Sequence, residues 1–258
     1  MTGWDLTYEE VENVRPFMEV AEDRGYTIGE NAEEMAVGEY RGENVFLDSQ
    51  DPSEASYNLL ADLVGDQLSD YGVRTPSSSY DGEAVLEEVG DEEDGILITE
   101  ELGTGTPMSE GEHSEEFYAE SLINTFAFEA LMGQGDIPEN TDTDSEGFYA
   151  FDFGNSGANI KGIYNAVKGE AQKVAENLGL DQEVQDYDRI GERAVEMAES
   201  LDLEELETLA TEKGVKQQAY IDIRQNIETA RKASETQQEI SEYFKPESPD
   251  EDEGVELL

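Results

Sequence analysis

Two polar clusters that lie close together in the chain constrain its fold more than any other feature. The first, residues 135–140 (GDIPEN), follows a strongly apolar helical pattern over residues 117–131. The second, Asp152-Phe153-Gly154, follows the short apolar run Phe148–Phe151, and turn-forming residues separate the two clusters. This order predicts a buried helix, a polar loop, a hairpin and a second polar turn.

The charge of the chain limits the partners that it can have. Its 258 residues include 65 acidic and 15 basic ones, a formal net charge of −50 at pH 7. Such a charge repels itself at low salt, and molar salt relieves the repulsion by shortening the Debye length to about 3 Å. Acidity spread along the chain, few Lys and no Cys resemble a cytoplasmic protein of an extreme halophile; the alternative is an acidic protein that binds cations or basic partners. Neither predicts a general nucleic-acid-binding protein, which needs a basic surface.

Several kinds of chemistry are excluded by residue type. The chain has no Cys, which rules out disulfides, thiol nucleophiles and Cys-ligated zinc. The single His, His113, lies in a Ser/Glu/Gly run that predicts a loop, so most His-based catalysis is not expected. The sequence has neither a stretch of 18 apolar residues nor a basic and apolar leader. We therefore expect a soluble cytoplasmic protein with no membrane partner.

Changes in hydrophobic period predict an α+β protein with its strands in the first part of the chain. The spacing of Thr7 and Glu10 and the apolar residues that follow predict a first helix to Gly25, interrupted by Pro16. The elements expected next are a hairpin over 35–47, a helix from Asp51 to about residue 71, and strands over 84–86 and 95–99.

The second part of the chain is predicted to be mainly helical. A core helix over 117–131 precedes the two polar clusters, and only helices are expected after Gly157, over residues 160–179, 190–201, 202–214 and 216–243. Residues 245–258, with two Pro and an acidic run, predict a disordered tail. The expected organisation is therefore an N-terminal unit over 1–102, a helical unit over 103–244 and the tail over 245–258.

The order of these segments resembles a two-lobed protein kinase-like fold. Residues 53–64 (SEASYNLLADLV) followed by 71–76 (YGVRTP), the strand-like run 95–102 (GILITEEL) and the two polar clusters are most similar to the HipA-like branch, which is related to the phosphatidylinositol kinases. The similarity extends from about residue 26 to about residue 235. It implies a small N-lobe that contains the β-strands and a mainly helical C-lobe.

The resemblance also implies roles for individual residues. Asp136 would orient the attacking hydroxyl or accept its proton, and Asn140 and Asp152 would hold Mg²⁺, which prefers hard oxygen ligands. Glu100 and Leu102 would border the adenine of ATP, and Arg41 would face its phosphates. The implied cofactors are Mg²⁺ and ATP, and the implied partners are a nucleotide and a second protein.

The chain departs from the kinase pattern where a triphosphate needs cations. Asp48 stands where such kinases have a Lys on the third strand, and no Lys precedes Lys161. Arg41 or Arg74 would have to replace it, although Arg differs from Lys in geometry and hydration. The loop over residues 29–34 (GENAEE) has one Gly and three carboxylates, which is unfavourable for a polyphosphate.

A smaller departure concerns the spacing of the first cluster, because Asp136 and Asn140 are four positions apart where the family has five.

Three hypotheses stay open from the sequence. The chain is a divergent HipA-like kinase that transfers phosphate from ATP to a protein or small-molecule hydroxyl, a catalytically degenerate kinase fold that acts as a binding or scaffold protein, or an unrelated α+β protein whose Asp and Asn residues form ordinary turns.

Overall fold

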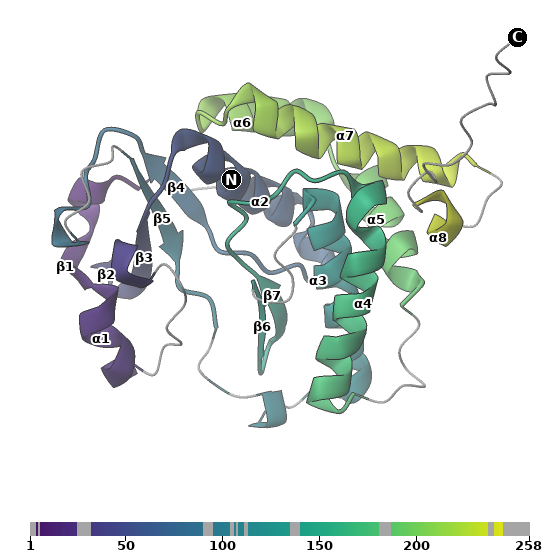
Figure 1. Cartoon of the computed structure of the whole chain (residues 1–258), viewed down its shortest axis with the longest axis horizontal. Coiled ribbons are helices and arrows are strands. Elements are labelled where there is room, and N and C mark those ends of the chain that lie inside the picture. The colour runs from purple at the N-terminus through teal and green to yellow at the C-terminus, as the bar shows by residue number, and fades with distance from the viewer. Residues whose placement is uncertain are drawn as a thin grey trace, which may run out of the picture.

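The computed structural model describes residues 4, 6–24, 32–89, 95–103, 106, 108–110, 113–134, 140–180, 187–236 and 240–244. A five-stranded antiparallel sheet forms one end of the molecule and helices form the other, so the predicted α+β class is confirmed (Figure 1). The sheet consists of β1 (Glu12–Pro16), β2 (Met35–Tyr40), β3 (Glu43–Ser49), β4 (Ser78–Asp81) and β5 (Ile96–Glu100). The helices are α1 (Phe17–Arg24), α2 (Pro52–Gln67), α3 (Glu115–Met132), α4 (Ile160–Leu178), α5 (Arg189–Ser200), α6 (Leu203–Glu212), α7 (Gln217–Ser234) and α8 (Ile240–Tyr243).

The two faces of the sheet are covered by different segments. Its strand order is β1-β2-β3-β5-β4, and Ala36, Leu47 and Ile98 are register partners that point to one face. They pack there with segments that flank the strands in sequence. Val37 and Phe46 are partners on the opposite face, where α1 covers them. Because side chains alternate along a strand, Asp48 shares this second face with Phe46.

Helix α2 joins the sheet to the helical end. The Asp51 side chain accepts hydrogen bonds from the backbone N–H of Ser53 at 2.6 Å and of Glu54 at 3.4 Å, which confirms the predicted helix start. The C-terminal half of α2 is buried in the same hydrophobic cluster as α3 and the later helices. The chain then returns to the sheet through β4, beside which α2 packs.

Helix α3 is the centre of the helical end. Its residues from Leu122 to Met132 are all buried, so it is surrounded by apolar contacts on every side. Gly133 ends it in the left-handed conformation, with φ 67°. A two-stranded hairpin of β6 (Thr141–Asp144) and β7 (Gly147–Ala150) follows and packs on α3, as do α4, α5 and α7 (Figure 1). The predicted core helix and hairpin are both confirmed.

The predicted first helix is wrong in its first half. The Thr7 N–H and hydroxyl both donate to the Glu10 carboxylate at 3.1 Å, but this contact closes only a 3-10 turn. The chain then forms the edge strand β1, and α1 begins at Phe17. Pairing with β2 and packing of Val14 against the sheet core prevail here over the local helical spacing.

Two other predicted elements differ from the structure. Residues 84–86 do not form a strand; β4 pairs beside β5 instead, and the apolar character of 84–86 is explained by Leu86, which is fully buried under the sheet. The long helix expected over 216–243 ends at Ser234 and is followed by the short α8, after which the buried Phe244 packs on Tyr164, with ring centroids 5.1 Å apart. The predicted tail over 245–258 lies outside the described residues. Of the helices that the structure describes, none has the length and apolar character to cross a membrane.

The contact between α6 and α2 offers a test of this packing. Lys213 donates to the Asp62 carboxylate at 2.6 Å and to the Ser78 carbonyl at 2.9 Å, and the two charged side chains are 16% and 6% exposed. Lys213→Met leaves the buried Asp62 carboxylate without a cation, although the Ser78 N–H still donates to it at 3.2 Å, and should lower the free energy of unfolding by about 3 to 5 kcal/mol. Urea unfolding in molar KCl measures it, with Lys216→Met at an exposed neighbouring position as the control. Equal effects of the two substitutions would contradict a stabilising role of the Lys213–Asp62 ion pair.

Candidate functional site

The hairpin brings two of the predicted site residues together. Asn140 precedes β6, Asp152 follows β7, and the strands pair Thr141 with Ala150. The Phe151 N–H donates to the Asn140 carbonyl at 3.0 Å, and the Asn140 side-chain amide donates to the Asp152 carbonyl at 2.9 Å. The predicted metal ligands Asn140 and Asp152 are therefore neighbours. The predicted catalytic residue Asp136 lies outside the described residues.

Asp152 is held in a conformation that few side chains adopt. Its φ is 51°, in the left-handed region that favours glycine. Its carbonyl oxygen accepts two side-chain amides, from Gln134 at 2.7 Å and from Asn140 at 2.9 Å. These two hydrogen bonds offset the strain of a left-handed non-glycine residue. The turn at Asp152 is therefore fixed by its backbone, while its side chain is exposed.

A chain of side-chain amides connects this turn to the sheet. The buried Phe153 N–H donates to Asn58 of α2 at 2.7 Å. The Asn58 amide donates to Gln50 at 3.3 Å, and the Gln50 amide donates to the Asp48 carboxylate at 2.7 Å. We call this set the amide relay: Asp48, Gln50, Asn58 and the Phe153 N–H. It couples β3, α2 and the turn after β7.

Helix α1 closes the sheet face next to the amide relay. Phe17, Val20 and Ala21 of α1 are buried against Val37 and Phe46, and the rings of Phe17 and Phe46 lie 6.2 Å apart. Burying this apolar surface stabilises the contact by roughly 25 cal/mol per Å². Helix α1 thus covers this face over β2, and Phe46 of β3 is partly buried beside it.

Arg41 and Arg74, the two candidates to replace the missing Lys, do not lie beside Asp152. Arg74 donates to both oxygens of Asp144, at 2.7 and 3.0 Å, and to the Gly147 carbonyl at 3.2 Å. It therefore anchors the turn end of the hairpin. Arg41 lies in the β2–β3 turn with its guanidinium 4.8 Å from the centre of the Tyr40 ring. Tyr40 and Asp48 point to opposite faces of the sheet, because side chains alternate between the faces along each strand. Tyr40 packs with the hydrophobic cluster on the face away from Asp48.

The predicted adenine-binding residues lie at the end of β5. The Glu100 N–H donates to the Ser77 carbonyl at 3.0 Å, so this backbone donor is used within the protein. The next N–H, of Glu101, donates to the Asn44 carbonyl at 3.2 Å, and the Asn44 amide donates to the Glu101 carboxylate at 2.6 Å. Leu102 follows, half-buried, before Gly103 turns the chain.

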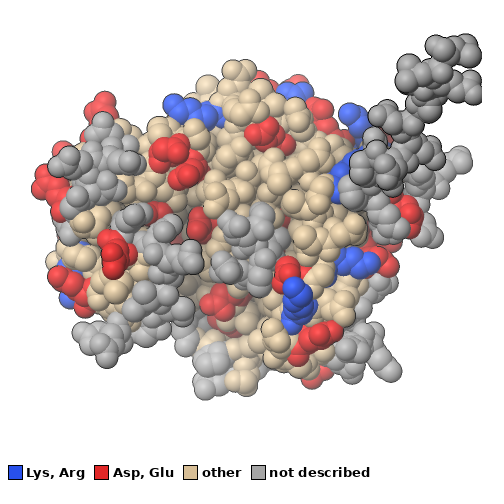
Figure 2. Space-filling model, in the orientation of Figure 1, with Lys and Arg blue, Asp and Glu red and all other residues tan. Residues whose placement is uncertain are grey.

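Charge around the hairpin is strongly negative. Burial raises the pKa of the Tyr149 hydroxyl, Asp142 and Asp144 raise it further, and Arg74 lowers it in part. Tyr149 therefore stays protonated and neutral across the physiological range. Figure 2 shows acidic side chains scattered over the whole visible face of the molecule. Within the described ranges, no three His, Cys, Asp or Glu side chains gather as metal ligands do.

The segment after the turn runs directly into α4. Gly157 and Ala158 donate their N–H groups to the carbonyls of Met132 and Gly133, at 2.9 and 3.1 Å. The buried Asn226 of α7 holds the same segment, because its amide donates to the Ala158 carbonyl at 2.8 Å and its oxygen accepts the Ile160 N–H at 2.9 Å. Residues 155–159 are therefore a short and tightly bonded connection.

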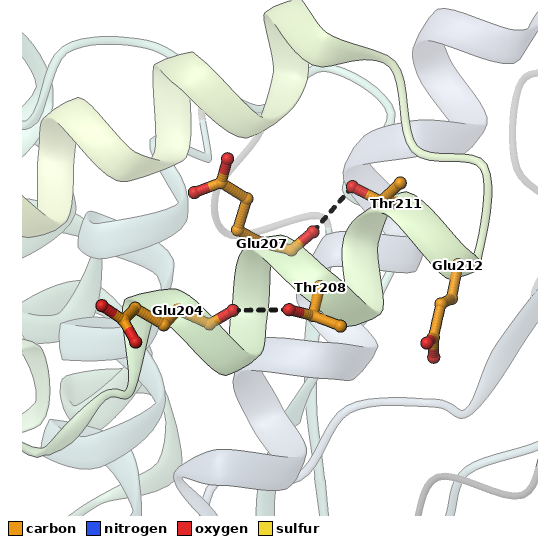
Figure 3. A pocket seen from close by; sticks show the side chains of 5 residues that line it. All are labelled: Glu204, Glu207, Thr208, Thr211 and Glu212. Atoms are coloured by element: carbon orange, nitrogen blue, oxygen red, sulfur yellow. Dashed lines mark hydrogen bonds between the residues drawn. The ribbon is translucent and has the colours of Figure 1, made fainter.

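A shallow hollow also lies on α6 (Figure 3), and it shares no residue with the candidate site. The Thr208 and Thr211 hydroxyls donate to the backbone carbonyls of Glu204 and Glu207, at 2.9 and 2.8 Å, so the helix itself uses both hydroxyls. The residues that line it are Glu204, Glu207, Thr208, Thr211 and Glu212.

Sequence reasoning missed two residues whose side chains hold the backbone of the candidate site in place. Asn58 and Gln134 were assigned no role, although Asn58 interrupts the apolar stripe of α2 and is 3% exposed. A polar residue inside an apolar helix pattern is a signal that could have found it, because buried polar groups need partners.

Comparison with known proteins adds no assignment: no family model, curated protein or solved structure matches this chain.

The amide relay can be tested at Asn58. Asn58→Ala leaves the Phe153 N–H buried without an acceptor, which should cost about 1 to 3 kcal/mol of stability and speed hydrogen exchange at that amide. Urea unfolding and amide exchange in molar KCl measure both effects. Asn165→Ala, at an exposed position of α4, is the control and should change stability by less than about 0.5 kcal/mol. Unchanged exchange at Phe153 in Asn58→Ala would contradict the relay.

Proposed function

We propose that this chain is a catalytically degenerate kinase-like fold that acts as a binding or scaffold protein. The observation that carries the proposal is the closure of the sheet face: α1 covers Phe46, and the neighbouring Asp48 presents a carboxylate that is bonded into the amide relay. The kinase-like part of the proposal is supported by element order. Apart from α1, which lies between β1 and β2, the chain has a three-stranded meander, a helix, two further strands, a buried helix, a hairpin and Asp152-Phe153-Gly154, an order that resembles that of protein kinases.

The position of α1 supports the loss of nucleotide binding. In protein kinases a Gly-rich loop between the first two strands covers the phosphates of ATP. Here the connection between β1 and β2 contains α1, which packs Phe17, Val20 and Ala21 onto the sheet. A nucleotide on this face would have to displace that buried apolar surface, at a cost that grows with its area.

The polar groups on the same face also suit a triphosphate poorly. Asp48 occupies the position at which the resemblance requires a Lys, and a carboxylate repels phosphate charge. Asn140 and Asp152 offer hard oxygens that suit Mg²⁺, but the Asn140 amide nitrogen already holds the Asp152 carbonyl. A metal could be held here by two side chains. Arg15 of β1, the register partner of Val37, is a cation on this face of the sheet, but β2 separates its strand from β3, which carries Asp48. The donor set thus fits Mg²⁺ in part and does not fit Mg²⁺ with ATP.

The short connection after the turn supports the loss of phosphate transfer. Protein kinases have an activation segment between the Asp-Phe-Gly motif and the following helices, and it carries their regulatory phosphorylation site. In this chain residues 155–159 alone separate Gly154 from α4, and their backbone groups are bonded to Met132, Gly133 and Asn226. This leaves no such segment in which to dock an acceptor.

A second candidate function is favoured by one observation. Asn140 and Asp152 are adjacent after a hairpin, and the Asp152 side chain is exposed. This arrangement suits a divergent HipA-like kinase, in which Asp136 would act on the hydroxyl of a protein or small-molecule acceptor.

Thermal unfolding with and without Mg²⁺ and ATP in molar KCl separates the two candidates. We expect no change in the melting temperature, because the sheet face is closed. A nucleotide present at about 100 times its Kd would add about 2.7 kcal/mol and raise the melting temperature by about 5 °C or more. Such a rise, lost in Asp152→Ala and kept in the exposed control Asp70→Ala, would contradict the proposal, as would ATP turnover with the same dependence.

The binding part of the proposal has its own test. Pull-down in molar salt should recover a stoichiometric partner. Because a degenerate kinase fold binds without the catalytic carboxylates, we expect binding to survive Asp136→Ala and Asp152→Ala. Loss of that partner in both variants would point to a site that still depends on these carboxylates, and would contradict the proposal.

A further inference from the structure

A carboxylic acid lies fully buried beneath the candidate site. Glu129 is on the buried helix α3 and is 0% exposed. One of its carboxyl oxygens, Oε1, accepts a hydrogen bond from the Thr141 hydroxyl of β6, and the other, Oε2, is buried without a hydrogen-bond partner. A buried polar atom of this kind is rare in a folded protein and calls for a specific reason.

Glu129 is linked to Asp152 along two routes. Its backbone carbonyl accepts the Gln134 N–H at 3.0 Å, and the Gln134 side chain donates to the Asp152 carbonyl at 2.7 Å. Its side chain holds Thr141, which directly follows Asn140, the second donor to the same carbonyl. Two hydrogen bonds fix the left-handed turn at Asp152, and both are connected to Glu129. The donor of one, Gln134, is bonded to Glu129 directly, and the donor of the other, Asn140, precedes Thr141, which Glu129 holds.

Among the residues that the structure describes, no cation pairs with Glu129. On the described elements that pack on α3 (the hairpin, α4, α5 and α7), the charged side chains are exposed or half-buried apart from the buried Asp144, which pairs with Arg74. Arg189 and Arg193 of α5 pair with Glu120 of α3. None of the charged groups among them acts appreciably on the carboxyl. Burial raises the pKa of Glu129 from its usual 4.5 to about 8, and the Thr141 hydrogen bond lowers it in part.

We propose that Glu129 is a proton-operated latch, whose neutral carboxyl holds the β6–β7 hairpin on α3 and whose ionisation releases the open end of the hairpin and the turn at Asp152. An ionised carboxylate cannot stay in a dry apolar site without a partner, so water or movement must supply one. Helix α3 is buried on every side and resists movement, whereas β6 is partly exposed. The turn end of the hairpin is anchored by Arg74, so the end near Thr141 is the part that yields. The latch holds whether or not the chain transfers phosphate.

The direction of the pH effect follows from linkage. Between about pH 5 and pH 8 the folded protein keeps a proton on Glu129 that the unfolded chain has lost, so stability falls as pH rises through this window. Above about pH 8 the group is ionised in both states and its contribution levels off. Other carboxylates titrate as well, but the difference between the protein and Glu129→Gln isolates this one group.

The latch is tested by comparing Glu129→Gln with the unaltered chain in molar KCl from pH 5 to pH 9. The ratio of their unfolding equilibrium constants should change by up to tenfold per pH unit, in favour of the folded variant as pH rises, and level off above about pH 8. Glu115→Gln, on the exposed first turn of the same helix, is the control and should give a ratio that stays flat with pH across this window. A flat ratio for Glu129→Gln would overturn the proposal.

A second measurement separates a latch from a merely buried acid. The NMR amide signals of Thr141 and Phe153 should titrate together with the Glu129 side-chain carboxyl, with a midpoint near pH 8, and this titration should vanish in Glu129→Gln. Thr141→Val removes the donor and should move the midpoint upward, which keeps the test open if Glu129→Gln does not fold. A carboxyl that titrates near its usual 4.5, or site amides that do not follow it, would overturn the latch.

Discussion

The buried amide of Asn58 is the contact on which the two ends of this molecule depend. Its oxygen is the acceptor of the Phe153 N–H at the end of the hairpin, and its nitrogen donates toward β3 through Gln50. A single side chain on α2 thereby sets the position of the turn at Asp152 relative to the sheet. Because an unsatisfied buried N–H costs about as much as a well-made hydrogen bond contributes, the sheet, α2 and the turn have to keep one relative arrangement.

The scarcity of cations shapes the rest of the structure. The chain has 15 basic and 65 acidic residues. In the described parts of the fold, several of the cations hold helices and strands together through ion pairs. Lys213 ties α6 to α2, Arg74 ties the hairpin to the segment before β4, and Arg189 and Arg193 tie α5 to Glu120 of α3. Each of these pairs offsets local repulsion between acidic elements. Arg74, which the sequence offered as a phosphate-binding residue, is used in this way.

Local signals predicted much of this architecture. The Asp51 cap, the Arg41–Gly42 hairpin turn, the apolar stripe of α3 and the Gly that follows several helices act within a few residues, so the sequence suffices to place them. The adjacency of Asn140 and Asp152 was also predictable, because a short hairpin has to bring its two ends together. The edge strand β1, the covering of Phe46 by α1 and the amide relay were not, since each depends on partners far away in sequence. Asn58 and Glu129 were visible only as polar residues inside apolar helices, and a pattern does not say what such residues contact.

The proposed function depends on closure of the sheet face beside Asp152 by α1 and by the amide relay. Paramagnetic broadening tests it most directly, with Mn²⁺ and ATP added together to isotope-labelled protein in molar KCl while the amide signals of Phe46, Asp48, Phe153 and Gly154 are followed. We expect these four signals to broaden no more than amides elsewhere on the surface. Selective broadening centred on them, present with ATP and removed by Asp152→Ala, would contradict it.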